Sequence, residues 1–257
     1  MTTTAPARSA EPDLAFFSPQ LMFSSPTRVR EIYEVGLKPF RERFQGARVL
    51  DVACNIGYWT HTALALGAKH VTAVDFHPET LDKARANLAE LGARGDQVAY
   101  VQEDTRDAVR RLIDERFDIV LCMGLLYHFV DPVGYLWDLA ALEADWLFID
   151  TAISFRSEPI LEYVIEKTGA ADNASGIKRA FPGRNVVGVP SEALIWKMLI
   201  EFGYEPATPN LAPLGHTGYS PNGANRKLIQ WWKRNPSPRY HRWRKTSDPV
   251  TDWVLRT

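Results

Sequence analysis

The sequence has few cysteines, no long apolar run and almost no net charge, and each absence removes a class of protein. Two cysteines among 257 residues cannot build a disulfide framework, which favours a reducing cytoplasm. No apolar stretch is long enough to span a bilayer, and the opening MTTTAPARSAEPD lacks the apolar core of a signal peptide. The net charge of −1 gives no global indication of a nucleic-acid or membrane partner. We therefore expect a globular cytoplasmic protein.

Glycine is scarce at the one place where a dinucleotide-binding protein would need it. The stretch VLDVACNIGYWT, residues 49–60, runs from an apolar strand through Asp51 into a turn whose only glycine is Gly57. A pyrophosphate site requires G-x-G-x-x-G, because the phosphates must approach the backbone amides closely. The turn also has no Lys or Arg to meet an anion. These absences disfavour NAD, FAD and ATP as ligands.

Short apolar runs alternate with amphipathic segments along the middle of the chain. The runs predict strands at 48–54, 70–76, 98–105 and 146–154, and a fourth strand within 117–128 that runs into a loop. The segments between them predict helices at 55–67, 78–92 and 107–114, and one that opens at Pro132 and buries Leu136, Leu139 and Ala140. Pro78 and Pro132 each open a helix, and Asp131 is placed to cap the second one. Five strands joined in this way predict an α/β fold with a doubly wound, mostly parallel sheet.

The flanking regions are less regular and divide the chain into parts. Residues 1–14 are expected to be a disordered tail, 15–44 a helical and aromatic cap, 45–235 the main domain, and 236–257 a basic aromatic tail. Within the main domain, 155–190 reads as an insertion on the substrate side, with a helix near SEPILEYVIEKTG and a long connection after it. The cap, which contains Phe16, Phe17 and Phe23, and the insertion are candidates for a lid that excludes water.

The turn at residues 51–57 resembles the first motif of class I S-adenosylmethionine-dependent methyltransferases, in a variant form D-x-x-C-N-x-G. Three further stretches, VTAVDFHP, VQEDT and FDIVLCMGLLYHFVDP, are similar to later motifs of that family and follow in the same order. The resemblance implies a seven-stranded sheet and S-adenosylmethionine as the cofactor. The resemblance also implies that Asp75 binds the ribose hydroxyls of the cofactor and that Asp104 binds its adenine amino group. The cofactor-binding residues it implies are Asp51, Ala53, Asn55, Gly57, Asp75, Phe76, Asp104, Thr105 and Met123.

The loop after the fourth strand is where such a family holds its methyl acceptor. We expect Tyr127 and His128 to act there, since an imidazole titrates near neutral pH and can accept a proton from a hydroxyl or amine. The alternative interpretation is that His128 takes no proton and only forms hydrogen bonds with the backbone or the substrate. Phe23, Tyr58 and Trp59 are candidates to contact the acceptor, although Tyr58 and Trp59 can equally pack against the N-terminal cap.

Metal chemistry is not indicated by the sequence. Cys54 and Cys122 are expected to be small buried thiols on neighbouring strands, and no His, Cys and carboxylate cluster has ligand spacing.

The basic, aromatic stretch 226–245 leaves the acceptor open. Interleaved Arg and Trp can bind RNA, whereas the simpler interpretation is an edge strand, KLIQWW, followed by a solvated tail. We predict methyl transfer to an oxygen or nitrogen of a small molecule. The rivals are a tRNA-modifying methyl or carboxymethyl transferase, since GLLYHFVDP also resembles the wobble-uridine carboxymethyl-transferring family, and a catalytically silent methyltransferase-like binding protein. The sequence gives no indication of oligomeric state.

Overall fold

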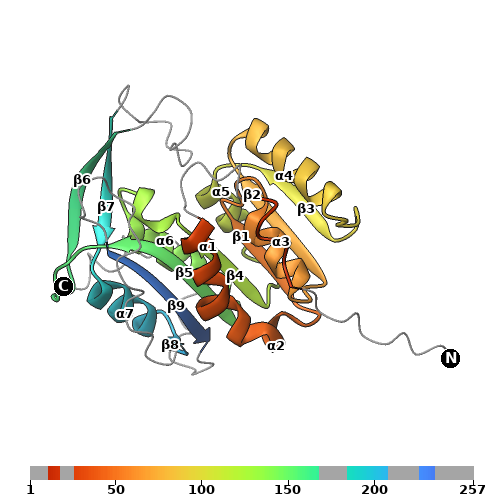
Figure 1. Cartoon of the computed structure of the whole chain (residues 1–257). Helices are drawn as coiled ribbons and strands as arrows, with labels where there is room; N and C mark the ends of the chain where they lie inside the picture. Colours follow the sequence, from red (N-terminus) through yellow and green to blue (C-terminus); the bar gives the residue numbers. More distant parts are fainter. Residues whose placement is uncertain (1–10, 18–25, 168–183, 208–225, 235–257) are drawn as a thin grey trace.

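A seven-stranded sheet forms the centre of the protein (Figure 1). The computed structural model describes residues 11–17, 26–167, 184–207 and 226–234, and every structural statement below refers to these. The strand order is β3-β2-β1-β4-β5-β9-β8. Strands β1 to β5 pair in parallel, whereas β9 pairs antiparallel with both β5 and β8. The sheet strands are β1 (Arg48–Val52), β2 (His70–Asp75), β3 (Val98–Gln102), β4 (Ile119–Met123), β5 (Trp146–Ile153), β8 (Tyr204–Pro206) and β9 (Arg226–Arg234). The predicted doubly wound, mostly parallel, seven-stranded sheet is confirmed.

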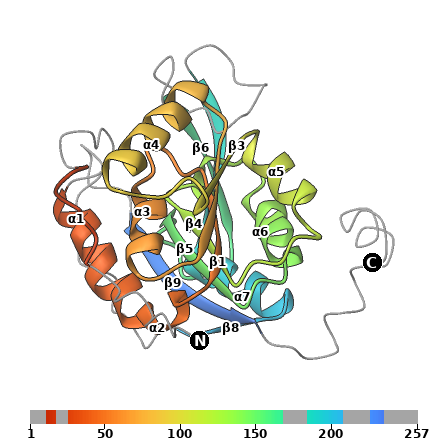
Figure 2. The same cartoon turned by 90° about the vertical axis from the view of Figure 1, so that its right-hand side faces the viewer.

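Helices cover both faces of the sheet, as Figure 2 shows. One face carries α1 (Pro26–Glu31), α2 (Arg41–Phe44), α3 (Tyr58–Ala65) and α4 (Pro78–Glu90), and the other carries α5 (Thr105–Arg111), α6 (Pro132–Ala141) and α7 (Glu192–Glu201). The sequence signals for helix starts are confirmed at α4 and α6, which begin at proline. Asp131 caps α6 by accepting a hydrogen bond from the Gly134 amide at 2.8 Å. Strands β1, β4 and β5 are buried almost throughout, because helices lie on both of their faces.

The N-terminal cap is helical, as predicted, and packs on the sheet. After α1 the chain continues as a π-helix, η2 (Ile32–Leu37), and a 3-10 turn, η3 (Lys38–Phe40), into α2. Ile32, Tyr33 and Leu37 share a hydrophobic cluster with Val49 and Met123 of the sheet. Part of the predicted tail also contacts this segment, since Glu11 accepts hydrogen bonds from Tyr33 and Arg41.

Two expectations about the later part of the chain are wrong. The segment expected to be a helix near residues 157–169 contains a strand, β6 (Leu161–Lys167), which pairs antiparallel with β7 (Arg184–Pro190). Its Tyr-Val-Ile run is made of aromatic and β-branched residues, which favour a strand, and a long partner strand was available. Strand β9 is not an edge strand either, because it lies between β5 and β8, and β8 forms the edge.

The β6–β7 pair stands beside the main sheet, where β7 contacts the short 3-10 helix η4 (Leu126–His128) and α6 (Figure 1). The Gly188 amide donates to the Phe129 carbonyl at 2.7 Å, so β7 is hydrogen-bonded to the loop after β4. The substrate-side placement of 155–190 stays a prediction, and residues 168–183 and 235–257 lie outside the described part. Within the described residues, no helix combines the length and the apolar character needed to cross a bilayer.

Candidate cofactor and acceptor site

The turn after β1 adopts a left-handed backbone at every second residue. Ala53, Asn55 and Gly57 have φ angles of 57°, 49° and 89°. Asparagine tolerates this conformation better than most residues, whereas alanine rarely adopts it. At Gly57 a side chain is excluded on two grounds, because a Cβ atom would also lie 3.2 Å from the side chain of Leu88. The alternation bends the chain sharply away from the sheet and into α3.

The amides of this turn bind within the protein, which explains why it is not a phosphate cradle. The Asn55 amide donates to Asp75 Oδ2 at 2.9 Å, and the Ile56 amide donates to the Asn55 side-chain oxygen at 2.7 Å. The Gly57 amide donates to the Cys54 carbonyl at 3.0 Å. A phosphate would need these donors free and pointing outward. The geometry therefore agrees with the exclusion of NAD, FAD and ATP that the sequence indicated.

Asp51 lies at the end of β1 with a carboxylate that is only half satisfied. The residue is 0% exposed, and its Oδ2 accepts a hydrogen bond from the Thr60 hydroxyl at 2.7 Å. Its Oδ1 is buried and has no hydrogen-bond partner among the residues that the structure describes. Burial raises the pKa of this carboxyl to about 7, with a further increase from Asp75 that the Thr60 bonds oppose. An acceptor atom of this kind suits a positively charged donor such as an ammonium group.

Asp75 ends β2 and is held rigidly beside the turn. Its Oδ2 accepts from the Asn55 amide at 2.9 Å and its Oδ1 from the His77 amide at 3.0 Å, so both oxygens are oriented. The residue is 7% exposed, and burial raises its pKa although the backbone hydrogen bonds oppose the change. Each carboxylate oxygen can accept more than one hydrogen bond. Asp75 can therefore still accept from two hydroxyl groups of a ligand.

The remaining predicted cofactor residues lie at neighbouring strand ends. Asp104 follows β3 and caps α5, because its Oδ1 accepts from the amides of Arg106 and Asp107 at 2.9 and 3.3 Å. Thr105 is buried as the first residue of α5, and Phe76 is half-buried after β2. Met123 is the last residue of β4 and is 7% exposed. The carboxyl ends of β1, β2, β3 and β4 thus bring all of these predicted residues to one edge of the sheet, where ligands of such sheets bind.

Tyr127 and His128 lie together in η4, immediately after β4. Both are half-buried, and their ring centroids are 4.1 Å apart. Gly124, with φ 70°, turns the chain from β4 into this loop, and its amide donates to the Asp150 carbonyl at 2.7 Å. The two residues predicted to face the acceptor thus lie four and five positions along the chain from Met123, which is predicted to bind the cofactor.

The candidates for acceptor contact from the first helix face the N-terminal cap. The Tyr58 ring meets Phe17 at a centroid distance of 5.1 Å and Trp59 at 4.6 Å, both nearly edge-on. These contacts agree with the second interpretation given above, in which Tyr58 and Trp59 pack against the N-terminal cap. A role for Tyr58 and Trp59 toward an acceptor stays a prediction. Phe23 lies outside the described residues.

A buried ion pair between the cap and the sheet escaped sequence reasoning. Arg28 of α1 binds the carboxylate of Asp150 in β5, and both residues are buried. Asp150 pairs in register with Met123, so the ion pair lies beside the end of β4. The signal that was available is the acid in WLFIDTAIS, because a carboxylate in an otherwise apolar buried strand needs a partner. The identity of that partner was not available from sequence, since Arg28 is 122 residues away along the chain.

The two cysteines are both buried, and burial raises the pKa of each thiol. Among the residues that the structure describes, there is no group of three or more His, Cys, Asp or Glu side chains that could hold a metal ion.

Comparison with known proteins finds similarity over the segment that holds most of these residues. A family model for a methyltransferase domain matches residues 49–140. Over 97 residues the chain is 38% identical to a ubiquinone biosynthesis O-methyltransferase of Xanthomonas axonopodis pv. citri (strain 306), a match that covers 38% of each protein. A protein of the same name from Xylella fastidiosa (strain M23) is 40% identical over 98 residues, or 37% of this chain and 36% of that one. The chain thus matches well under half the length of these curated relatives.

Solved structures resemble most of the chain. The N-terminal domain of EvdMO1 with SAH (S-adenosylhomocysteine) bound has a TM-score of 0.57 and 22% identity, covering 81% of this chain and 80% of that one. The magnesium protoporphyrin IX methyltransferase ChlM from Synechocystis PCC 6803 with bound SAM has a TM-score of 0.54 and 19% identity, covering 81% and 79%. At these identities the likeness shows the fold. The chain thus has the Rossmann-like fold of these methyltransferases, and residues 49–140 within it match the methyltransferase-domain model.

Proposed function

We propose that the protein is an S-adenosylmethionine-dependent methyltransferase that acts on an oxygen or nitrogen of a small molecule. The observation that carries the proposal is the pair of buried carboxylates at the turn after β1. Asp51 presents a buried oxygen without a hydrogen-bond partner, and Asp75 presents a carboxylate fixed by two backbone amides. A ligand that brings an ammonium group and a ribose, and no phosphate, fits these groups.

Four positions would hold this cofactor. Asp51 Oδ1 accepts a hydrogen bond from the ammonium of the amino acid end, and Asp75 accepts from the ribose hydroxyls. Asp104 uses Oδ1 to cap α5, so its other oxygen is the one we assign to the adenine amino group. Ala53 has a left-handed backbone within this turn, and its small side chain leaves room for close approach of the methionine portion.

The acceptor side requires alignment and, for a hydroxyl acceptor, a base. The bound cofactor supplies an electrophilic methyl group on a positively charged sulfur. His128 accepts the acceptor's proton at an imidazole nitrogen, and Tyr127, whose ring lies against it, orients the acceptor. The cap excludes water from this edge of the sheet, because Phe17 packs on Tyr58 and Arg28 binds Asp150 beside Met123.

A small-molecule acceptor is supported by the relatives, which are ubiquinone biosynthesis O-methyltransferases. The described part of the basic stretch favours the same conclusion. Trp232 is 0% exposed and packs against Trp196, while Lys233 and Arg234 form ion pairs with Glu205 and Glu143. The buried Trp232 is therefore not available to stack on bases, and Arg234 is paired with Glu143 at 2.9 Å.

The proposal is tested by calorimetric titration of S-adenosylhomocysteine into the wild-type protein and an Asp75→Ala variant. The loss of two hydrogen bonds to a charged group, about 1.5–3 kcal/mol each, should weaken binding by roughly 100-fold or more. Asp75→Asn keeps one acceptor oxygen and should bind with intermediate affinity. Asp82→Ala, which removes an exposed carboxylate from α4, is the matched control and should bind like the wild type. Equal affinity of Asp75→Ala and wild type would refute the assignment.

A further inference from the structure

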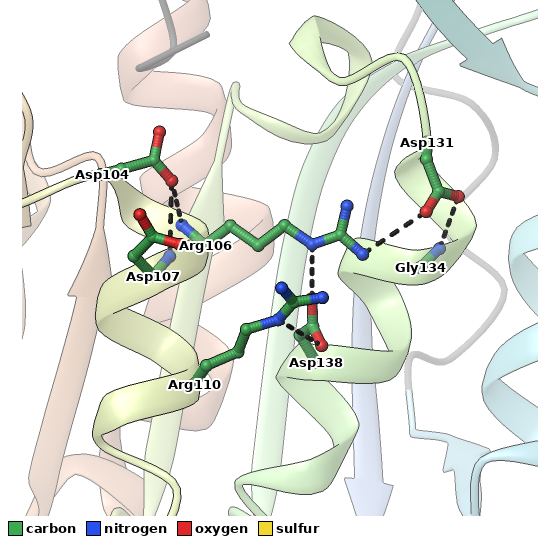
Figure 3. A network of polar contacts seen from close by, with 7 residues as sticks. All are labelled: Asp104, Arg106, Asp107, Arg110, Asp131, Gly134 and Asp138. Carbon is green, nitrogen blue, oxygen red and sulfur yellow. Dashed lines mark hydrogen bonds and ion pairs between the residues drawn. The ribbon is translucent and has the colours of Figure 1, made fainter. Parts of the chain in front are cut away.

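A charged network joins the loop after β3 to the loop after β4 on the face opposite the N-terminal cap. Arg106 of α5 donates from Nε to Asp138 Oδ2 at 2.6 Å, and its Nη2 lies 3.4 Å from Asp131 Oδ2 (Figure 3). Arg110 donates from Nε to the other oxygen of Asp138 at 3.2 Å. The Arg106–Asp138 pair is mostly shielded from water, with side chains 24% and 10% exposed, so it is screened less than a surface pair. Asp131 lies at the more open end of the network, with a side chain 51% exposed.

The two ends of Arg106 are tied to opposite sides of the candidate site. Its amide is held by Asp104, the residue we assign to the adenine, and its guanidinium reaches Asp131. Asp131 caps α6 and lies three residues after His128. A single residue therefore connects the adenine side of the site to the loop that carries the acceptor residues.

The contact between Arg106 and Asp131 is not needed to hold α5 against α6. Asp138 already joins α5 to α6 through both Arg106 and Arg110. The second branch of Arg106 instead crosses the first turn of α6, and it can do so because residue 134 is glycine. A Cβ atom on Gly134 would lie 2.0 Å from Asp131 Oδ2 and 2.5 Å from Arg106 Nη2. Only a glycine at this position leaves room for the contact.

The opposite side of the same loop is also fixed, since the Gly188 amide of β7 donates to the Phe129 carbonyl. Arg106 acts on Asp131, two residues further on. The loop from Gly124 to Asp131 is thus held between β7 and α5, and the contact from α5 connects it to Asp104.

We propose that Arg106 is a positioning residue, which fixes the Tyr127–His128 loop relative to the adenine end of the cofactor site. The inference rests on the proposed cofactor site. Arginine suits the role because its planar guanidinium bridges two carboxylates at once, which an ammonium on a flexible stem does less well. Binding of the cofactor at Asp104 is then transmitted to the acceptor loop through one side chain.

The test is hydrogen–deuterium exchange of residues 124–131, with and without S-adenosylhomocysteine, in four proteins. Gly134→Ala keeps every charge but displaces both the Asp131 carboxylate and the Arg106 guanidinium, whereas Arg106→Gln removes the guanidinium alone. Arg110→Gln is the matched control, because Arg110 pairs with Asp138 and, within the described part of the chain, has no contact with Asp131, and its side chain is 56% exposed. In the wild type and the control, the ligand should slow exchange both around Asp104 and in residues 124–131. In Gly134→Ala and Arg106→Gln the slowing around Asp104 should persist, while that in residues 124–131 should fall at least threefold.

Wild-type protection of residues 124–131 in both variants would overturn the inference. A purely structural role would raise exchange equally with and without the ligand, and that outcome also counts against it. Gly134→Ala keeps the test valid if Arg106→Gln does not fold, since the atoms it meets are the ends of flexible side chains. If S-adenosylhomocysteine fails to bind even the wild type, the cofactor assignment itself is wrong and the inference falls with it, a result that the calorimetry above detects separately.

Discussion

Replacement of Asp51 by asparagine should change how the stability of the protein depends on pH. The carboxyl is 0% exposed, and its pKa lies near 7 against an ordinary value of 3.8. Below pH 4 the group is protonated in both the folded and unfolded protein. Between pH 4 and 7 the unfolded chain releases the proton, while the folded protein retains it. Because the folded-state pKa is the higher one, the free energy of unfolding falls as the pH rises through this window and levels off above 7.

The size of the effect follows from the gap between the two pKa values. A gap of about three pH units, at 1.36 kcal/mol for each, corresponds to roughly 4 kcal/mol over the whole window. Between pH 5 and pH 8, which most folded proteins tolerate, the share due to Asp51 is about 2.5 kcal/mol. An asparagine does not titrate, so the variant should lack this share while every other group behaves as in the wild type.

Urea denaturation of both proteins at pH 5 and pH 8 measures this quantity as a double difference. The wild type should lose about 2.5 kcal/mol more than Asp51→Asn between the two pH values, whatever the absolute effect of the substitution. A double difference under about 0.5 kcal/mol would show that the carboxyl is not buried and half satisfied as described. The same reasoning predicts that S-adenosylhomocysteine binding near pH 6 releases a proton, because its ammonium favours the ionised carboxylate. Calorimetry in two buffers of different ionisation enthalpy detects that release.

Two further predictions concern the backbone turn and the buried ion pair. Gly57→Ala should lower the free energy of unfolding by about 2 kcal/mol, because φ is 89° and the new methyl group meets Leu88. Ala53→Gly should relieve backbone strain and either leave stability unchanged or raise it by up to about 1 kcal/mol. Similar losses of stability for the two variants in thermal melts would contradict the described turn. Arg28→Met leaves Asp150 buried and unpaired and should destabilise by about 3–5 kcal/mol, and Arg28→Met combined with Asp150→Leu should recover most of this in urea denaturation. A double variant as unstable as the single one would argue against a direct pair.

The features that could be predicted from the sequence are those that depend on short stretches of neighbouring residues. The alternation of buried runs with amphipathic segments predicted the parallel sheet, because strands covered on both faces must be apolar throughout. The strand-end carboxylates, Asp51, Asp75 and Asp104, lie at one edge of the sheet because carboxyl ends of parallel strands meet there. Asn55 signalled its own left-handed backbone, since asparagine tolerates that conformation better than most residues.

Features that depend on distant partners were not predictable in this way. Strand β6 was expected to be a helix, because its apolar run fits either state and its partner β7 begins seventeen positions after β6 ends. Strand β9 was expected at an edge, although its position between β5 and β8 is decided by topology and not by its own residues. Ala53 gave no signal at all, since alanine is rare in the left-handed region and is held there by the bonds of its neighbours.

The Arg28–Asp150 pair bears directly on the rival carboxymethyl chemistry. A carboxylated cofactor carries an extra negative charge and requires a cation near the transferred group, and no motif supplied one. Arg28 is a buried cation beside the end of β4, but its guanidinium is bound to Asp150. A carboxylate that reached Arg28 would therefore stand against a second buried carboxylate, and like charges at that distance in a poorly hydrated site repel strongly. The charge of the pair is already balanced without a ligand, which favours a cofactor whose transferred group is an uncharged methyl.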